Sequence, residues 1–197
     1  MFELSLYSVV LLAHIAAAIV LVSSAVFAPL TRGAVLRAPT LERLRDWITF
    51  LEHSVRANPP AAMLLLGTGL YMGSTGWWSQ TWFFVALGAW VANFVLATFV
   101  VKPAVAAVAR AAASGEGPVD AGIDGLRRSR RWEVGEGLMR GNDFAMLYVM
   151  FVKPSGLESG LIVAAAAAVC VGLEWALTRR AGRAQLPGLT AATTEAS

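Results

Sequence analysis

Long runs of apolar residues separated by short polar connections dominate the pattern along the chain. Four runs approach the roughly 20 mostly apolar residues that a helix needs to cross a bilayer, where every backbone N–H and C=O must be satisfied within the helix. These runs cover about 4–30, 58–74, 81–102 and 157–178. Pro59 and Pro60 belong at the start of the second run, where missing N–H donors are tolerated.

A fifth apolar segment, about 134–152, begins with charged residues and ends with the wholly apolar stretch Phe144 to Val152. Its length is just within the range for a span. In front of the second run, residues 40–57 carry apolar side chains at helical spacing with charges opposite, which predicts an amphipathic helix at the interface or leading into that span. Its apolar positions are Leu41, Leu44, Trp47, Ile48, Leu51 and Val55.

Two other segments have little apolar patterning. Residues 109–125 are small, polar and rich in glycine, which predicts a mobile connection. Residues 183–197 have too little apolar surface to order themselves, so we expect a disordered tail after a single helical domain at 1–182. The first run follows Glu3 rather than basic residues and is longer than the apolar part of a secretory signal, so it is read as a retained helix.

Composition places the chain among integral membrane proteins. It has 197 residues, 57% hydrophobic and 15% charged, with a mean hydropathy of +0.61, which is far more apolar than a soluble domain of this length. The net charge of +3 comes from short basic runs beside apolar segments, and no aromatic and basic module for nucleic acid is visible. Cys170 is the only cysteine, so a disulfide within the chain is excluded.

Arginine clusters predict the orientation of the helices, because basic residues are enriched in cytoplasmic loops. Clusters follow the first, third and last runs, whereas the loop 74–80 carries no charge. All three clusters are cytoplasmic only if 134–152 also crosses the membrane. We therefore expect an all-α bundle with five transmembrane helices, its N-terminus outside and its C-terminus inside.

Several stretches resemble a known family. The early "LAHIAAAIVLVSSAVFAPLTRGA", the glycine-marked "MLLLGTGLYM", and "LRRSRRW" with the closing "LYVMFVKP" look like the bacterial integral-membrane family described as domain of unknown function 2269. The resemblance covers about residues 4–154 and implies a multi-pass protein of the bacterial inner membrane. It implies no activity, and it makes 157–178 an added fifth helix.

A weaker likeness concerns the first helix. His14 followed by "FAPLTR" is similar to the first helix of copper-resistance-D-like membrane proteins and of the membrane protoporphyrinogen oxidase that uses haem. In that oxidase a first-helix histidine and a third-helix lysine matter, and the matching positions are His14 and, loosely, Lys102. This likeness implies a haem-dependent oxidoreductase, with haem b as the cofactor.

His14 is the strongest candidate for a cofactor ligand, because an ionisable side chain within a span faces the bundle interior and imidazole is a common haem ligand. The alternative is a hydrogen bond between helices. A shared metal with His53 is not expected, since His53 precedes Pro59 near the cytoplasmic interface. No phosphate loop, catalytic nucleophile with its base, or zinc helix is found.

The charged half of the segment 130–154 is the second candidate site. Glu133, Glu136, Arg140 and Asp143 are spaced by three, four and three residues and share one helix face. They are either a solvated helix end or part of a polar interior in which Arg140 pairs with the acid on either side, Glu136 and Asp143. The residues expected in that interior are Glu136, Arg140, Asn142, Asp143 and Asn93.

Three further features have structural explanations. Asn93 is expected to form hydrogen bonds between helices, and Glu174 to be solvated near Arg179 or Arg180. Gly69 with Gly73 and Gly156 with Gly160 predict close helix contacts. The sequence thus favours an accessory or ion-handling membrane protein, with the haem-dependent oxidoreductase as the alternative, and leaves open a homo-oligomer or larger membrane complex as its partners beside the bilayer.

Overall fold

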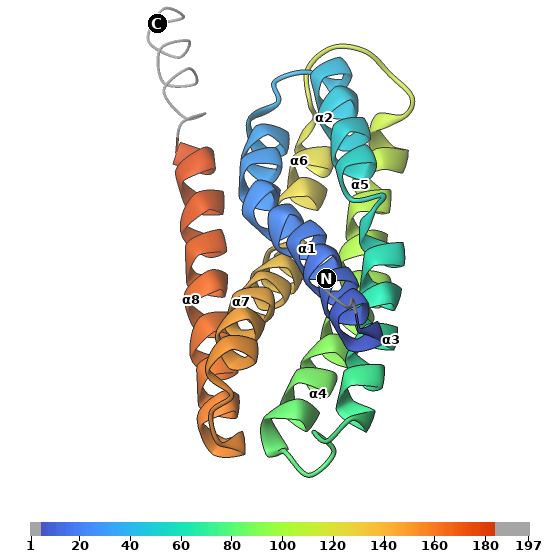
Figure 1. The fold of residues 1–197 in the computed structure, drawn as a ribbon. Helices are drawn as coiled ribbons and strands as arrows, with labels where there is room; N and C mark the ends of the chain where they lie inside the picture. Colours follow the sequence, from blue (N-terminus) through green and yellow to red (C-terminus); the bar gives the residue numbers. More distant parts are fainter. Residues whose placement is uncertain (1–4, 184–197) are drawn as a thin grey trace, which may run out of the picture.

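The computed structural model describes residues 5–183, and all regular elements in this range are helical. In chain order they are α1 (Leu6–Arg37), α2 (Leu41–Ser54), α3 (Asn58–Ser74), α4 (Thr81–Val95), η1 (Leu96–Val101), α5 (Lys102–Ala112), α6 (Ala121–Arg127), α7 (Arg130–Val152) and α8 (Gly156–Arg183). The segment η1 is a π-helix that continues α4 into α5 without a break. The protein is therefore a bundle of five long helices, with α2 and α6 at one end (Figure 1).

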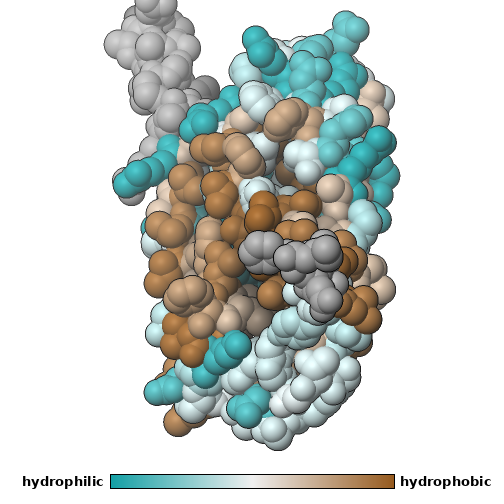
Figure 2. Space-filling model, in the orientation of Figure 1, coloured by the Kyte–Doolittle hydropathy of each residue, from teal (hydrophilic) through white to brown (hydrophobic). Residues whose placement is uncertain are grey.

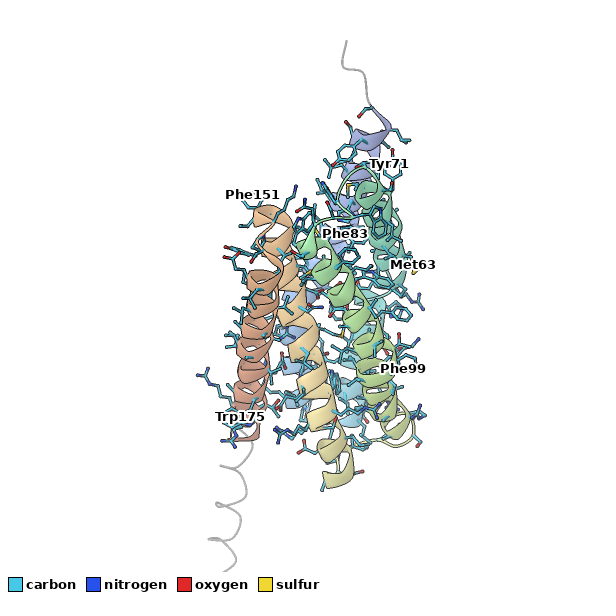
Figure 3. All side chains as sticks on the ribbon, turned by 90° about the horizontal axis from the view of Figure 1, so that it is seen from below. Met63, Tyr71, Phe83, Phe99, Phe151 and Trp175 are labelled. Atoms are coloured by element: carbon cyan, nitrogen blue, oxygen red, sulfur yellow. The ribbon has the colours of Figure 1, made fainter. Side chains whose placement is uncertain are left out.

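Three of these helices are long and apolar enough to cross a membrane: Leu6–Arg37, Thr81–Ala112 and Gly156–Gly182. Large apolar side chains cover the outside of the bundle, and Phe151 and Phe99 are 90% and 60% exposed (Figure 3). An apolar band crosses the middle of the visible face, and polar residues gather at the end that holds α2 and α6 (Figure 2). The three apolar helices of spanning length suggest a multi-pass membrane protein.

Local sequence signals explain where several helices begin. The hydroxyl of Ser5 accepts a hydrogen bond from the Ser8 N–H (3.2 Å) at the start of α1, and Asp120 accepts one from the Ile123 N–H (2.8 Å) at the start of α6. Such side chains satisfy N–H groups that the first turn leaves free. Pro59 and Pro60 occupy the first turn of α3, where a missing donor is tolerated. Helices occur at all five predicted segments, but the first continues to Arg37 rather than about 30, and the third continues through η1 and α5 to Ala112 rather than about 102.

The charged end of the bundle comprises α2, α5, α6 and the adjoining ends of α1, α7 and α8 (Figure 1). Here Leu44, Val108 and Ala112 are fully buried in one core that also contains Trp132. The helix predicted at 40–57 is α2, and protein covers its apolar positions Leu41, Leu44, Ile48 and Leu51. An amphipathic helix next to a membrane can thus pack its apolar face on other helices.

The prediction of a mobile connection at 109–125 is wrong. The Leu41 N–H donates to Gly117 O (2.9 Å), the Val119 N–H donates to Pro39 O (3.2 Å), and the Gly117 N–H donates to Glu42 Oε1 (2.9 Å). Hydrogen bonds from Thr40 and Gly117 lower the pKa of Glu42 to about 2. The small residues of this connection allow its backbone to approach the start of α2 closely and form these hydrogen bonds. The tail predicted to be disordered lies at 184–197, outside the described residues.

Arg127, which is buried, and Arg128, which is half-buried, connect α6 to the end of α1. Arg127 Nη1 donates to the carbonyls of Val35 (2.9 Å) and Ala38 (2.7 Å), at a helix end where carbonyls lack the donor four residues on. Arg127 and Arg128 both pair with Asp124, at 2.7 and 2.8 Å. Partial burial alone would raise the pKa of Asp124, but the hydrogen bonds and charges of the two arginines lower it below its ordinary value. These arginines therefore have structural roles.

Candidate functional site

A buried polar network joins α1, α7 and α8 near the charged end. It consists of Arg32, Trp132, Glu136, Arg140 and Glu174. Glu174 is fully buried and contacts both arginines: Arg32 Nε forms an ion pair with Oε2 at 3.0 Å, and Arg140 Nη1 donates a hydrogen bond to Oε1. Arg140 Nη2 is 3.8 Å from Glu136 Oε2, and Trp132 Nε1–H donates to Glu136 Oε1 (2.7 Å).

The network closes on itself through an aromatic contact. The guanidinium carbon of Arg32 lies 4.7 Å from the centre of the Trp132 ring, a cation–π contact that gains strength away from water. Each of the five side chains thus touches two others. Two arginines and two glutamates balance in charge, which makes their joint burial tolerable.

A proline in α1 helps to position Arg140. Pro29 lies inside α1 and has no N–H to donate to the carbonyl of Ala25, four residues earlier. Arg140 Nε donates to this carbonyl instead, at 3.1 Å. The side chain of Arg140 therefore contacts α1 and α8 at once, while its backbone belongs to α7.

Close contact between α7 and α8 brings Glu174 to Arg140. A Cβ added at Gly137 would lie 2.7 Å from Val171 Cα, and one at Gly141 would overlap the backbone of Ala167. These glycines are four residues apart, the small-xxx-small spacing of tightly packed membrane helices. The same spacing predicts close contacts at Gly69 with Gly73 and at Gly156 with Gly160. An added Cβ would meet α1 at Gly69 and α4 at Gly73 and Gly156, but nothing within 4 Å at Gly160.

A second polar cluster lies one turn further along α7 and faces α4. Asn93 Nδ2 donates to Asp143 Oδ1 (2.6 Å), and Asn142 Nδ2 donates to Asn93 Oδ1 (2.9 Å) and to Ala89 O (2.7 Å). Asn93 thus forms the hydrogen bonds between helices that its position suggests. Of the two acids predicted to pair with Arg140, Glu136 does so at 3.8 Å, whereas Asp143 contacts Asn93 and the second acid on Arg140 is Glu174.

Two readings based on solvation are also corrected. Glu174 was expected to be solvated beside Arg179 or Arg180, but it is fully buried against Arg32 and Arg140. Glu133 is buried too, so the charged face of α7 is not a solvated helix end. Arg32 and Trp132 were missed as members of the site. Pro29, which frees a carbonyl in α1, is the signal that could have indicated an arginine partner nearby.

His14 lies between α1 and α3. Its Nδ1 is 2.9 Å from Thr68 Oγ1, and Thr68 donates its own proton to Leu64 O (2.6 Å). The histidine is therefore the donor, with its proton on Nδ1. Its Cε1 would be 3.4 Å from a Cβ added at Gly69. The hydrogen bond between helices, one of the two alternatives for His14, is present.

The residues near His14 do not fit a haem held by two histidines. Ser24 donates to Asn58 Oδ1 (2.7 Å), so α3 runs antiparallel to α1 and His53, before Asn58, lies beyond the level of Ser24. Ten residues of helix separate His14 from Ser24, about 15 Å at 1.5 Å per residue. His53 bonds Thr49 O within α2. Lys102, the other position implied by the likeness, is exposed at the charged end.

Within residues 5–183 no group of three or more metal-ligating side chains is found. No protein-family model matches the chain, and neither does any curated protein or solved structure. The resemblance to the family of domain of unknown function 2269 therefore stays a prediction. The case for a function rests on the buried polar network and the cluster beside it.

Proposed function

We propose that the chain is a five-pass protein of the bacterial inner membrane whose polar interior passes a small ion. The observation that carries the proposal is the network of Arg32, Trp132, Glu136, Arg140 and Glu174, buried inside a bundle whose outside is apolar. Charged groups inside a membrane bundle are costly to bury and mark ion or proton pathways in many transport proteins.

The packing of α7 supports its role as a fourth long crossing. Arg140 contacts α1 and α8 and Asp143 contacts α4, while large apolar side chains in the other half of α7 are exposed: Phe144, Leu147, Tyr148 and Phe151. It also lies tightly along α8, an apolar helix of spanning length. Charges that make α7 look polar in sequence are thus compatible with a position inside a bilayer.

The position of α3 supports the fifth crossing. Its 17 residues correspond to about 25 Å, the short end of the range for a span. It runs antiparallel to α1, with contacts at both ends through His14 to Thr68 and Ser24 to Asn58. Helices lying side by side over this length share the same depth.

Reporter fusions test the crossings and the orientation. A reporter fused after Arg183 is expected in the cytoplasm, and one inserted into the loop 74–80 is expected outside, because basic residues mark the cytoplasmic side. The arginine clusters at the charged end favour a cytoplasmic position for that end. A reporter after Arg183 that reads as external would remove one crossing and contradict the proposal.

Flux through reconstituted vesicles tests the ion-handling activity. Proteoliposomes loaded with a pH-sensitive dye receive potassium chloride, nitrate or gluconate gradients, with valinomycin present to set the potential. We expect faster flux in at least one salt than in protein-free vesicles. Arg140→Gln is expected to remove the difference, because it breaks the network, whereas Arg37→Gln changes an exposed residue on α1 and serves as the matched control. Rates equal to those of protein-free vesicles in every salt would refute the activity.

A further inference from the structure

The polar network leaves several strong hydrogen-bonding atoms without partners. Among the described residues, Arg32 Nε, Nη1 and Nη2, Arg140 Nη2, Glu136 Oε2 and Glu174 Oε2 are buried and have no hydrogen-bond partner, although Arg32 Nε and Glu174 Oε2 form an ion pair at 3.0 Å. Arg32 is only 1% exposed. An unpaired polar group in a protein interior costs about 1–3 kcal/mol, and more when it is charged, so these atoms point to an occupant that satisfies them.

These atoms belong to side chains that meet at one place. Arg32 and Arg140 share the carboxylate of Glu174. Arg140 Nη2 faces Glu136 Oε2 at 3.8 Å, too far for a good hydrogen bond. Arg32 stacks on Trp132, whose N–H holds the other oxygen of Glu136. Four donor nitrogens of the two arginines and two carboxylate oxygens of this network thus lack hydrogen-bond partners.

Because donors outnumber acceptors among the unpartnered atoms, an ion bound by them would be negatively charged. A cation would face two guanidinium groups, and the two carboxylate oxygens without hydrogen bonds already lie within ion-pair distance of these arginines, whereas an anion would accept from Arg32 and Arg140 together. Guanidinium groups are weakly hydrated and bind anions with fixed geometry. The side chains are already in contact around the network, so only a small anion fits.

Charge balance sets the valence of the anion and couples it to a proton. The network is neutral with two arginines and two glutamates ionised, so one bound monovalent anion would leave it at −1. Glu174 has both oxygens on arginines, while Glu136 Oε2 is free to take a proton. One proton on Oε2 restores neutrality and turns an unpartnered acceptor into a donor toward the anion.

We propose that Arg32, Arg140 and Glu136 bind one small monovalent anion, of the size of chloride or nitrate, together with one proton on Glu136 Oε2. This inference rests on the proposed ion-handling function and names its ion. The charged and titratable groups around Glu136 are Arg32 from α1, Glu133 and Arg140 from α7, and Glu174 with the neighbouring Cys170 from α8. Glu133, three residues earlier on the same helix face, lies toward the charged end.

Proton uptake on anion binding tests the proposal directly. The purified full chain in detergent, in weak buffer with a pH indicator, is titrated with sodium chloride, nitrate or gluconate, and binding is measured in parallel by calorimetry. We expect about one proton taken up per chloride or nitrate and none with gluconate. Because one proton accompanies one anion, the affinity is expected to fall about tenfold per pH unit where free Glu136 is ionised.

Variants separate the anion from the proton. Glu136→Gln supplies a permanent donor in place of the carboxyl group, so it is expected to bind the anion with no proton uptake and no dependence on pH. Arg32→Gln is expected to lose binding, and Arg37→Gln, an exposed arginine on the same helix, to retain it. Circular dichroism and gel filtration check folding, and if Arg32→Gln does not fold, Glu136→Gln alone decides.

The outcomes also separate this inference from the proposed function. No binding of chloride or nitrate to the unmutated protein overturns the inference, and the unpartnered atoms then bind water. Binding without proton uptake overturns it as well. Flux in gluconate as fast as in chloride shows ion passage without the anion, which leaves the function intact and refutes the inference. Anion binding with proton uptake in detergent, together with no flux in any salt, supports the inference and refutes the proposed ion passage.

Discussion

Helix α1 makes two polar junctions with the rest of the bundle, and they differ in kind. In its first half, His14 bonds Thr68 and Ser24 bonds Asn58, each a pair of neutral groups between α1 and α3. Near its end, Arg32 joins a network that spans three helices and carries four charges. A neutral pair can be removed without leaving a charge behind, whereas every member of the network neutralises another.

The largest expected effect comes from removing the shared carboxylate. Glu174→Leu leaves Arg32 and Arg140 buried without their common partner, and breaking a buried ion pair in this way costs about 3–5 kcal/mol. Unfolding in mixed detergent and sodium dodecyl sulfate measures the loss. Leu173→Ala, at the neighbouring exposed position, is the control. If Glu174→Leu lowers the free energy of unfolding by less than about 1 kcal/mol, the charged network is no more important for stability than the neutral junction.

The next effect concerns the helix contact that closes the network. Gly141→Ala adds a Cβ that overlaps the backbone of Ala167 and pushes α7 away from α8. Overpacking of this kind costs about 1–3 kcal/mol. Gly172→Ala is the matched control, because a Cβ there would meet nothing within 4 Å. Equal stabilities of the two variants in the same unfolding assay would show that close contact of α7 and α8 is unnecessary.

The ion pairs of Asp124 at the charged end can be compared with the buried network through the pH dependence of the stability that they contribute. The arginines lower the pKa of Asp124 below 3.8, so its ionised form contributes stability above that pH and the contribution is lost as pH falls through the lowered pKa. Asp124→Asn should remove about 1 kcal/mol at neutral pH, given its partial exposure.

Pepsin cleavage within 113–128, compared between pH 4 and pH 2, follows this local stability. The unmutated protein is expected to become more susceptible as the pH falls, beyond the change in the activity of pepsin on an unfolded substrate. Asp124→Asn should be susceptible throughout. An equal dependence on pH in both proteins would assign the effect to other groups.

The smallest expected effect is at the neutral junction. His14→Ala removes one hydrogen bond to Thr68, and such bonds between membrane helices average about 0.6 kcal/mol. Ile15→Ala, an exposed neighbour, controls for the loss of side-chain bulk. A loss as large as that of Glu174→Leu would mean that His14 has a role beyond helix contact.

Helix positions were accessible from the sequence because hydropathy and capping are local properties. The sequence did not indicate Glu174 as a partner of Arg140. One acid stands four residues before Arg140 and another three residues after it, and helix spacing alone cannot rank these two against an acid on a different helix. Glu174 lies 34 positions away and meets Arg140 only because Gly137 and Gly141 bring α7 onto α8. In the sequence, Arg32 belongs to the arginine cluster that predicts orientation, and nothing near it indicates that it also pairs with Glu174.

The segment η1 has a consequence for how the two halves of the third long helix evolve. A π turn contains one residue more than an α turn, and one residue corresponds to about 100° of helix rotation. The phase of α5 is therefore offset from that of α4, so Val108 and Ala112 meet α2 while Phe83 and Ala86 pack in the membrane half. Deleting a single codon within 96–101 would let this segment continue as an α-helix and leave the downstream side chains of α5 facing nearly the same way, whereas deleting one within the regular turns of α4 would turn all of them by about 100°.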